Sequence, residues 1–155
     1  MKPVTVSVIV PERREDVFAF LDVLASHEAF TDHFLVDWKT SGPRSGVGAR
    51  ARMRVKGPRA GDWLEMEVVA SEWPSRTVEE SVGAGGRRRT RGTYRLDDLP
   101  AGGTRISFEL AWLEAPPAER IAAPLIRAVA RRANAKALDR LAVALAYEPP
   151  AVASA

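Results

Sequence analysis

The spacing of hydrophobic and polar residues predicts that most of this chain forms β-strands. Valine occupies every second position from residue 4 to residue 10, a spacing typical of a strand with one buried face. Five further alternating segments lie between residues 47 and 113, and turns rich in glycine or proline separate them. Because connections this short join neighbouring strands of opposite direction, the pattern favours an antiparallel sheet.

Two regions have helical spacing instead. From Pro11 to about Phe34, early acidic residues and an apolar side predict a helix and then a second, short helix. From about Pro117 to Ala146, alanine and leucine recur on one face and basic residues on the other, which predicts one long amphipathic helix. Pro124 is expected to kink its start or to separate off a short preceding turn. A curved sheet around one long helix encloses a space, so this α+β arrangement suggests a container for an apolar molecule.

The composition fits one soluble domain, which we predict over residues 1–147, with a flexible tail at 148–155. Hydrophobic residues make up 46% and charged residues 28%, as in ordinary globular proteins. There is no cysteine, so disulfides and thiolate chemistry are excluded, and a cytoplasmic location is expected. The first apolar stretch is short and interrupted, which argues against a signal peptide, and no run is long enough for membrane insertion. The net charge of +3 does not call for a nucleic-acid partner.

The order of several loose motifs resembles a known superfamily. They are the segment Pro-Glu-Arg-Arg-Glu-Asp-Val-Phe-Ala-Phe-Leu at residues 11–21, Trp38 before Gly46-Val-Gly48, Trp73-Pro74, Gly92-Thr-Tyr-Arg-Leu96 and Gly103-Thr-Arg-Ile-Ser-Phe108. With the opening strand they resemble the SRPBCC/START-like superfamily, specifically its bacterial polyketide cyclase/dehydrase-type proteins, over roughly residues 3–146. The resemblance implies the helix-grip fold: a curved antiparallel sheet around a long C-terminal helix, with two short helices after the first strand. It also implies a hydrophobic cavity, and no fixed catalytic residues.

Motifs that would identify a specific chemistry are weak in this sequence. Residues 46–51 match the dinucleotide glycine fingerprint, but a turn precedes them and a strand follows, so glycines at a sheet bend are the better interpretation. The arginines at 87–91 are interpreted as a solvated sheet face paired with glutamates on neighbouring strands. His27 and His33 lack the spacing of metal ligands, so they are interpreted as surface or helix-end residues, and no metal or cofactor is expected.

Two polar residues interrupt apolar faces. Glu80 alternates with Val78 and Val82 in the register expected to face inward, with Arg88 as its nearest inward cation. The alternative is a register break that turns Glu80 to solvent, against an arginine. Asn134 lies on the apolar face of the long helix, where it either bonds a nearby backbone group or anchors a ligand.

We therefore predict a protein that binds a small, largely apolar molecule, either lipid-like or polycyclic and polyketide-like, as a monomer or homodimer. The alternative is a polyketide cyclase, aromatase or dehydratase with Glu80 as its one weak catalytic candidate; a non-catalytic protein is favoured. The predicted ligand-binding residues are Phe30, Phe34, Trp38, Met53, Met66, Glu80, Tyr94, Phe108, Trp112, Asn134, Leu138 and Leu141.

Overall fold

The computed structural model describes residues 1–57 and 62–147, so the tail predicted at 148–155 lies outside the described residues. A seven-stranded antiparallel sheet has the strand order β1-β7-β6-β5-β4-β3-β2. Its strands are β1 (Val4–Val10), β2 (Leu35–Ser41), β3 (Arg50–Val55), β4 (Asp62–Glu72), β5 (Arg76–Gly83), β6 (Arg88–Asp98) and β7 (Thr104–Glu114). The first strand therefore pairs with the last one, which places the N-terminal strand at one edge of the sheet.

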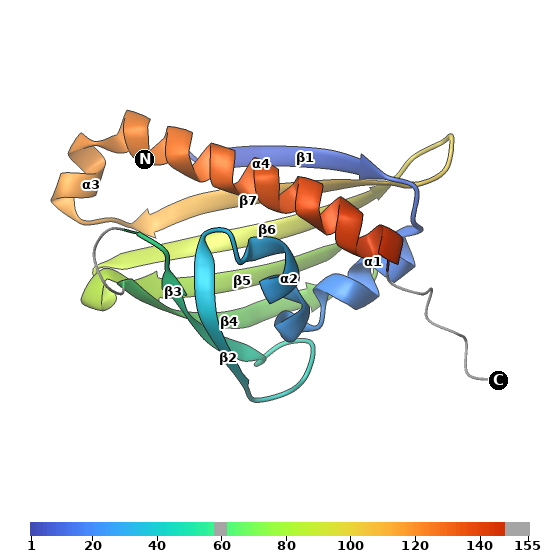
Figure 1. Cartoon of the computed structure of the whole chain (residues 1–155), viewed down its shortest axis with the longest axis horizontal. Coiled ribbons are helices and arrows are strands. Elements are labelled where there is room, and N and C mark those ends of the chain that lie inside the picture. The colour runs from blue at the N-terminus through green and yellow to red at the C-terminus, as the bar shows by residue number, and fades with distance from the viewer. Residues whose placement is uncertain (58–61, 148–155) are drawn as a thin grey trace.

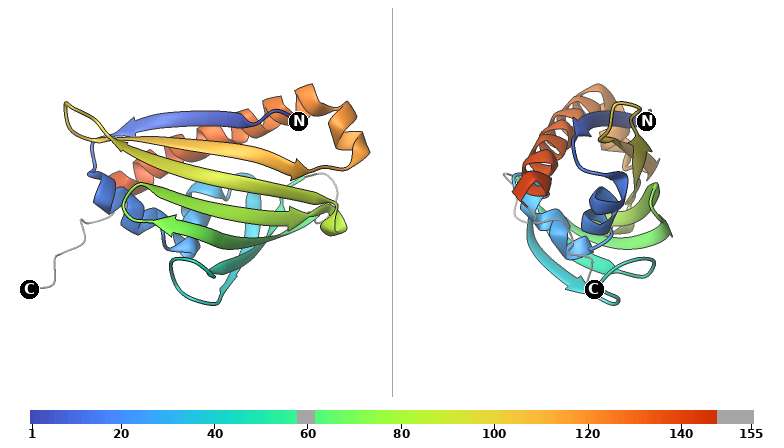
Figure 2. Two further views of the ribbon diagram at one scale, coloured as in Figure 1. Left: turned by 180° about the vertical axis from the view of Figure 1, so that it is seen from behind. Right: turned by 90° about the vertical axis from the view of Figure 1, so that its right-hand side faces the viewer.

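The helices lie on the concave face of this curved sheet (Figures 1 and 2). They are α1 (Arg14–Leu21), the 3-10 turn η1 (Leu24–His27), α2 (Glu28–Thr31), α3 (Pro117–Ile121) and α4 (Ala123–Tyr147); a second 3-10 turn, η2 (Ala84–Gly86), joins β5 to β6. The break at Ala122 separates α3 from α4, as the position of Pro124 predicted. α4 crosses the sheet diagonally and has contacts with β1 and α2 (Figure 1).

The structure confirms the helix-grip fold, and the register of most strands follows the predicted alternation. In β1 the four valines face inward, because Val4 and Val10 are buried while Thr5 and Ser7 point away from the core. The main core cluster joins β1, β6 and β7 to α1 and the second half of α4, and a second cluster lies under β3 and β4.

β2 is the strand that the sequence pattern did not predict. It pairs with β3, but its register shifts between Val36 and Lys39. Asp37 in the shift has φ 58°, a left-handed conformation that interrupts the pleat. Because of this irregularity the inward residues Leu35 and Trp38 are three positions apart, so the segment has no period-two pattern.

Candidate functional site

The space between the sheet and α4 is closed at one end. In the second half of α4 the buried residues are Ala137, Leu138, Leu141 and Leu145, which pack into the main core cluster. In the first half, residues 123–136, no side chain is buried, although Ile126 and Ala130 are on the same inward face. The helix therefore seals the space near α1 and leaves it partly exposed near α3.

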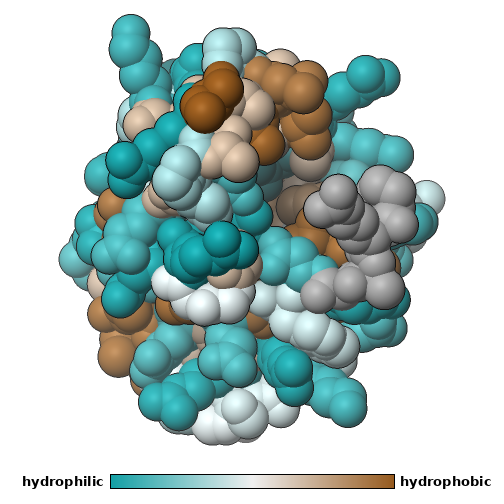
Figure 3. Space-filling view, turned by 90° about the vertical axis from the view of Figure 1, so that its left-hand side faces the viewer, coloured by the Kyte–Doolittle hydropathy of each residue, from teal (hydrophilic) through white to brown (hydrophobic). Residues whose placement is uncertain are grey.

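Inward-facing sheet residues show the same gradient. Leu96 and Ile106 near the α1 end are at most 1% exposed, whereas Leu110 and Trp112 at the α3 end are only half-buried. Inward apolar side chains at this end therefore remain accessible to solvent. The candidate ligand site is therefore the region between the first half of α4 and the adjoining ends of β4, β6 and β7, and Figure 3 views the molecule from this end.

Glu79, not Glu80, faces this interior. Its strand register pairs it with Gly92, and a Cβ on Gly92 would lie 3.1 Å from Glu79 Oε1 and 2.8 Å from the Phe108 ring. The absence of a side chain at position 92 makes room for both groups. Glu79 is 8% exposed overall, and burial raises the pKa of its carboxyl group to about 8.

The prediction that Glu80 points inward is wrong. Glu80 lies on the outer face of β5, where Arg91 Nη2 donates to its carboxylate at 2.8 Å. The error came from Val78, which is 3% exposed although it is on the outer face, between its cross-strand neighbours Ala70 and Thr93. Because alternation takes buried apolar residues as inward-facing, a buried valine on the outer face assigns every residue of the strand to the wrong face. Arg88 does face inward, but it binds other carboxylates and not Glu80.

His27 is the buried neighbour of Glu79, so its interpretation as a surface residue is wrong, whereas its position at a helix end is confirmed. It is 2% exposed, at the end of η1. Its Nε2 is 2.7 Å from the carbonyl oxygen of Leu21, and because a carbonyl only accepts, Nε2 carries the hydrogen. The other nitrogen, Nδ1, then presents a lone pair 3.7 Å from Glu79 Oε2.

The two side chains form a neutral pair around pH 7. Burial lowers the pKa of His27 to about 4, against a smaller opposing effect of the Leu21 carbonyl, and burial raises the pKa of Glu79 to about 8. His27 Nδ1 and Glu79 Oε2 are close enough, at 3.7 Å, for an ion pair. The ion pair is nevertheless not the main state, because both charged side chains would be buried without solvation. Glu79 is consequently a protonated acid at neutral pH, and the distance to His27 is too long for its hydrogen to be firmly bound there.

Tyr94 completes this buried group, which we call the His27–Glu79–Tyr94 cluster. Its ring stands edge-on to His27 at 5.7 Å between centroids and lies 4.6 Å from Phe108. Burial, and secondly a negative charge on Glu79, raise the pKa of its hydroxyl well above the usual value. The cluster offers a carboxylic acid and a phenol on one side of the interior.

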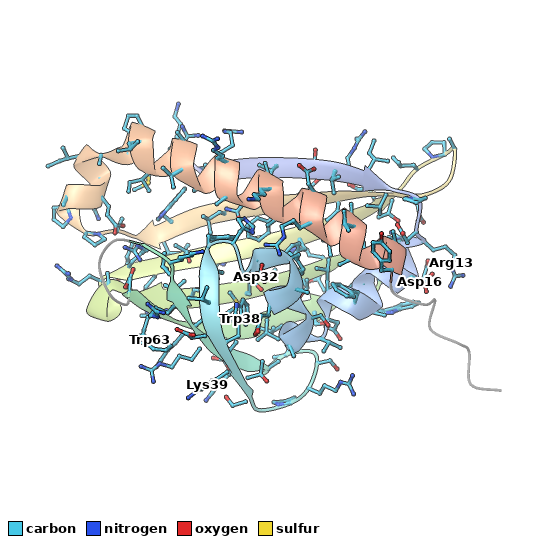
Figure 4. The ribbon with its side chains drawn as sticks, viewed as in Figure 1. Arg13, Asp16, Asp32, Trp38, Lys39 and Trp63 are labelled. Carbon is cyan, nitrogen blue, oxygen red and sulfur yellow. The ribbon has the colours of Figure 1, made fainter. Side chains whose placement is uncertain are left out.

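The other predicted site residues are divided between the two core clusters. The main cluster contains or touches Phe30, Phe34, Tyr94, Phe108, Leu138 and Leu141, and the second cluster contains or touches Met53, Met66, Phe34 and Trp38. Trp38 projects from β2 beside α2 (Figure 4), and its ring is 6.4 Å from that of His27. A role in binding a ligand remains a prediction for each of these residues.

Asn134 adopts the local alternative. Its Nδ2 donates to the carbonyl of Ala130 at 2.9 Å, one turn earlier in α4. His33 instead connects helices, with Nε2 2.9 Å from the Ala133 carbonyl and Nδ1 2.8 Å from Arg140 Nη1. These bonds fix α4 against the segment that follows α2.

A charged group lies at the partly exposed end. Arg88 at the start of β6 binds the carboxylate of Glu119 on α3 and that of Asp62 on β4. Partial burial would raise the pKa of Asp62, but the hydrogen bonds from Arg88 and from the Ala84 N–H outweigh it and lower this pKa. The Asp62 carboxylate is therefore ionised at neutral pH, and Arg88 ties α3 to the sheet.

The outer face of the sheet is charged, as predicted. An open groove of about 510 Å³ lies over β2–β5, lined in part by Arg50, Arg52, Glu65, Glu67, Glu80 and Arg89. Cross-strand register places Arg50 opposite Glu67 and Arg52 opposite Glu65, which agrees with the predicted pairing of opposite charges. Arg52 also lies 4.3 Å above the Trp63 ring.

Sequence reasoning missed Glu79 and His27 for different reasons. His27 had a usable signal, because Leu24, His27 and Phe30 are three residues apart and all three are buried. Glu79 had none, since its orientation depends on the buried outer-face Val78 and on the space above Gly92.

Comparison with known proteins supports the fold. No protein-family model and no curated protein match this sequence. A protein from Thermus thermophilus, TTHA0849, is similar in structure with a TM-score of 0.74 and 18% identity over 94% of this chain and 97% of that one. Norcoclaurine synthase from Thalictrum flavum has a TM-score of 0.71 and 14% identity over 95% and 87% of the two chains.

DynU16, a putative protein in the dynemicin biosynthetic locus, has a TM-score of 0.66 and 20% identity over 96% of this chain but 48% of its own.

Among residues 1–57 and 62–147 no helix has the length and apolarity needed to cross a membrane. The closed core, the long helix α4 and these structural similarities together show that the chain has the helix-grip fold.

Proposed function

We propose that this protein binds a small, largely apolar molecule between the sheet and the first half of α4. The observation that carries the proposal is the partial exposure of inward apolar residues, such as Leu110, Trp112 and Ile126, beside a fully buried core. Removing apolar surface from water contributes about 25 cal/mol per Å², so this region gains free energy when a guest covers it. That the guest is polycyclic or polyketide-like follows from the resemblance of the sequence, and the similar protein DynU16 belongs to a biosynthetic locus.

The His27–Glu79–Tyr94 cluster would orient such a guest. A protonated carboxyl group and a phenol donate hydrogen bonds, so the favoured ligand carries a carbonyl or ether oxygen at one end. The absence of a second inward carboxylate in the cluster favours binding over catalysis. The same acid nevertheless supports one alternative function.

That alternative is a cyclase, aromatase or dehydratase in which Glu79 is the general acid. A carboxyl group with a pKa of about 8 still holds its proton at neutral pH and can donate it to a carbonyl or a departing hydroxyl group. Glu79 takes over the role that the sequence gave to Glu80. The name of the structurally similar norcoclaurine synthase shows that this fold can carry an enzyme.

Binding is tested by filling the proposed space. The dye 8-anilinonaphthalene-1-sulfonate should bind the native protein saturably, and long-chain fatty acids or flat aromatic molecules should displace it. Leu110→Trp, which places a larger ring inside, should weaken dye binding at least about tenfold. Leu113→Trp on the same strand is the matched control, because Leu113 is 44% exposed and should leave binding unchanged. Equal affinity of both variants and the natural chain would contradict the proposal.

Catalysis is tested at Glu79. Native mass spectrometry of freshly purified protein would weigh a retained guest, and that compound would then be assayed for turnover. If Glu79 is the acid, Glu79→Gln abolishes turnover and keeps the dye affinity within about threefold, because the amide keeps the shape but not the exchangeable proton. Unchanged turnover in this variant would remove the catalytic alternative.

A further inference from the structure

α3 and the first half of α4 expose an aliphatic surface that the sequence pattern did not reveal. Ile121, Leu125 and Val129 are 85%, 66% and 61% exposed. Leu125 and Val129 are four residues apart in α4, on a face turned away from the inward-facing Ala130, so they form one stripe. Apolar side chains gather at the upper part of this end of the molecule in Figure 3.

Basic side chains lie at both ends of the stripe. Arg132 and Lys136 continue the same face of α4 one and two turns later, and Arg120 lies beside Ile121. Arg127 and Arg131 lie on the side of α4 that faces β1, where they bind the backbone carbonyls of Lys2, Pro3 and Thr5. Within residues 1–57 and 62–147, none of these five cations forms an ion pair with a carboxylate.

An aliphatic stripe with cations at both ends restricts the kind of partner that can bind it. A nucleic acid would neutralise the arginines but would leave three aliphatic side chains against phosphates and sugars. A second copy, related by a two-fold axis through this face, would cover the stripe but bring like charges together. The surface of an anionic bilayer satisfies both parts, since lipid phosphates meet the cations and the acyl region receives the aliphatic side chains.

We propose that α3 and the first half of α4 dock on the surface of an anionic lipid bilayer. The stripe of Ile121, Leu125 and Val129 enters the boundary between headgroups and acyl chains, and Arg120, Arg132 and Lys136 bind phosphate groups. This docking needs no spanning helix, because only side chains enter the lipid. The docked end is also the end at which the interior is partly exposed, and the stripe lies on the face of α4 turned away from that interior.

The first experiment measures co-sedimentation with vesicles of phosphatidylcholine, with or without phosphatidylglycerol. We expect binding to the anionic vesicles, at least about tenfold weaker binding to phosphatidylcholine alone, and loss of the difference in 1 M salt, where the Debye length is about 3 Å. No binding to anionic vesicles at low salt would overturn the proposal.

Two variants separate the apolar and the basic parts. Leu125→Gln should lower affinity for the anionic vesicles about tenfold. The double variant Arg132→Ala/Lys136→Ala should lower it by at least about tenfold, since each cation near an anionic surface contributes about fivefold. Val143→Gln is the matched control: Val143 is 57% exposed on the same helix and lies about 27 Å along it from Leu125, so affinity should not change.

The same samples identify a competing occupant. Sedimentation velocity should show that Leu125→Gln leaves the oligomeric state unchanged. If the natural chain is a dimer that this variant dissociates, the stripe is an interface between copies, and the bilayer proposal is wrong. Vesicle binding that Val143→Gln weakens as much as Leu125→Gln would also overturn it, because the docking surface would then not be the one assigned.

Discussion

The two ends of the interior are built from similar strands and one continuous helix, yet they differ in how completely they are filled. Near α1, large side chains such as Phe18, Leu96 and Leu141 are at most 2% exposed, and the packing leaves nothing for water to reach. Near α3 the same sheet presents Leu110 and Trp112 half-buried, and α4 contributes alanines in place of leucines. One end stabilises the fold, and the other is the region proposed to bind a ligand. The row of the sheet that contains Glu79 and Gly92 is the boundary between them.

The largest expected effect on stability comes from shortening a buried side chain at the closed end. Leu141→Ala should lower the free energy of unfolding by about 2–5 kcal/mol, because it leaves a cavity at a side chain that is 0% exposed. Leu110→Ala at the other end should lower it by about 1 kcal/mol or less, since the leucine is already partly exposed. Urea denaturation of both variants measures the difference. Equal losses would mean that the two ends are filled alike.

At the boundary, Gly92→Ala should lower the free energy of unfolding by about 1–3 kcal/mol. The new methyl group would lie 2.8 Å from the Phe108 ring, so the ring or the strand must move. Gly57→Ala is the control, because a Cβ there meets no atom within 4 Å. Thermal unfolding followed by circular dichroism compares them, and a Gly92 variant as stable as the Gly57 variant would show that the ring has room to move.

The smallest expected effect is a pH dependence that belongs to Glu79. Its folded pKa of about 8 exceeds the unfolded value of 4.5, so its contribution is complete below pH 4.5 and is lost as pH rises toward 8. His27, with its folded pKa lowered from 6.5 to about 4, acts in the opposite direction between pH 4 and 6.5. The contribution of Glu79 is therefore unopposed between about pH 6.5 and 8, where the free energy of unfolding should fall by about 1 kcal/mol per pH unit.

Urea titrations across this interval test the assignment. Glu79→Gln should flatten the slope, because the amide does not titrate. Glu80→Gln should keep it, because Glu80 pairs with Arg91 on the outer face. A slope that disappears in the Glu80 variant and persists in the Glu79 variant would restore the inward orientation that alternation predicted for Glu80.

The sequence predicted the fold far better than the polar part of the site. Period-two spacing in β1 and the leucines of α4 reflect burial on one face, so the sheet and the helix were predicted correctly. The inward orientation of residues such as Met53, Phe108 and Leu138 was also predicted correctly. Alternation failed wherever the pleat or the burial was irregular. Because Asp37 has a left-handed conformation, β2 has no alternating pattern and was not predicted. Because Val78 is buried on the outer face, alternation assigned the inward orientation to Glu80 when it belongs to Glu79. The burial of His27 was not predicted, because the spacing of histidines indicates whether they can bind a metal but not whether they are buried.

The pairing of β1 with β7 has a consequence for how this chain acquires its structure. Val4 forms its ladder with Leu110, so β1 has no partner until β7, the last strand, is available. During synthesis the four valines of β1 must remain soluble or be shielded by other segments, because the sheet closes over them only late. Contacts so distant in sequence slow folding, so we expect a refolding rate set by the docking of this edge strand rather than by formation of the central hairpins.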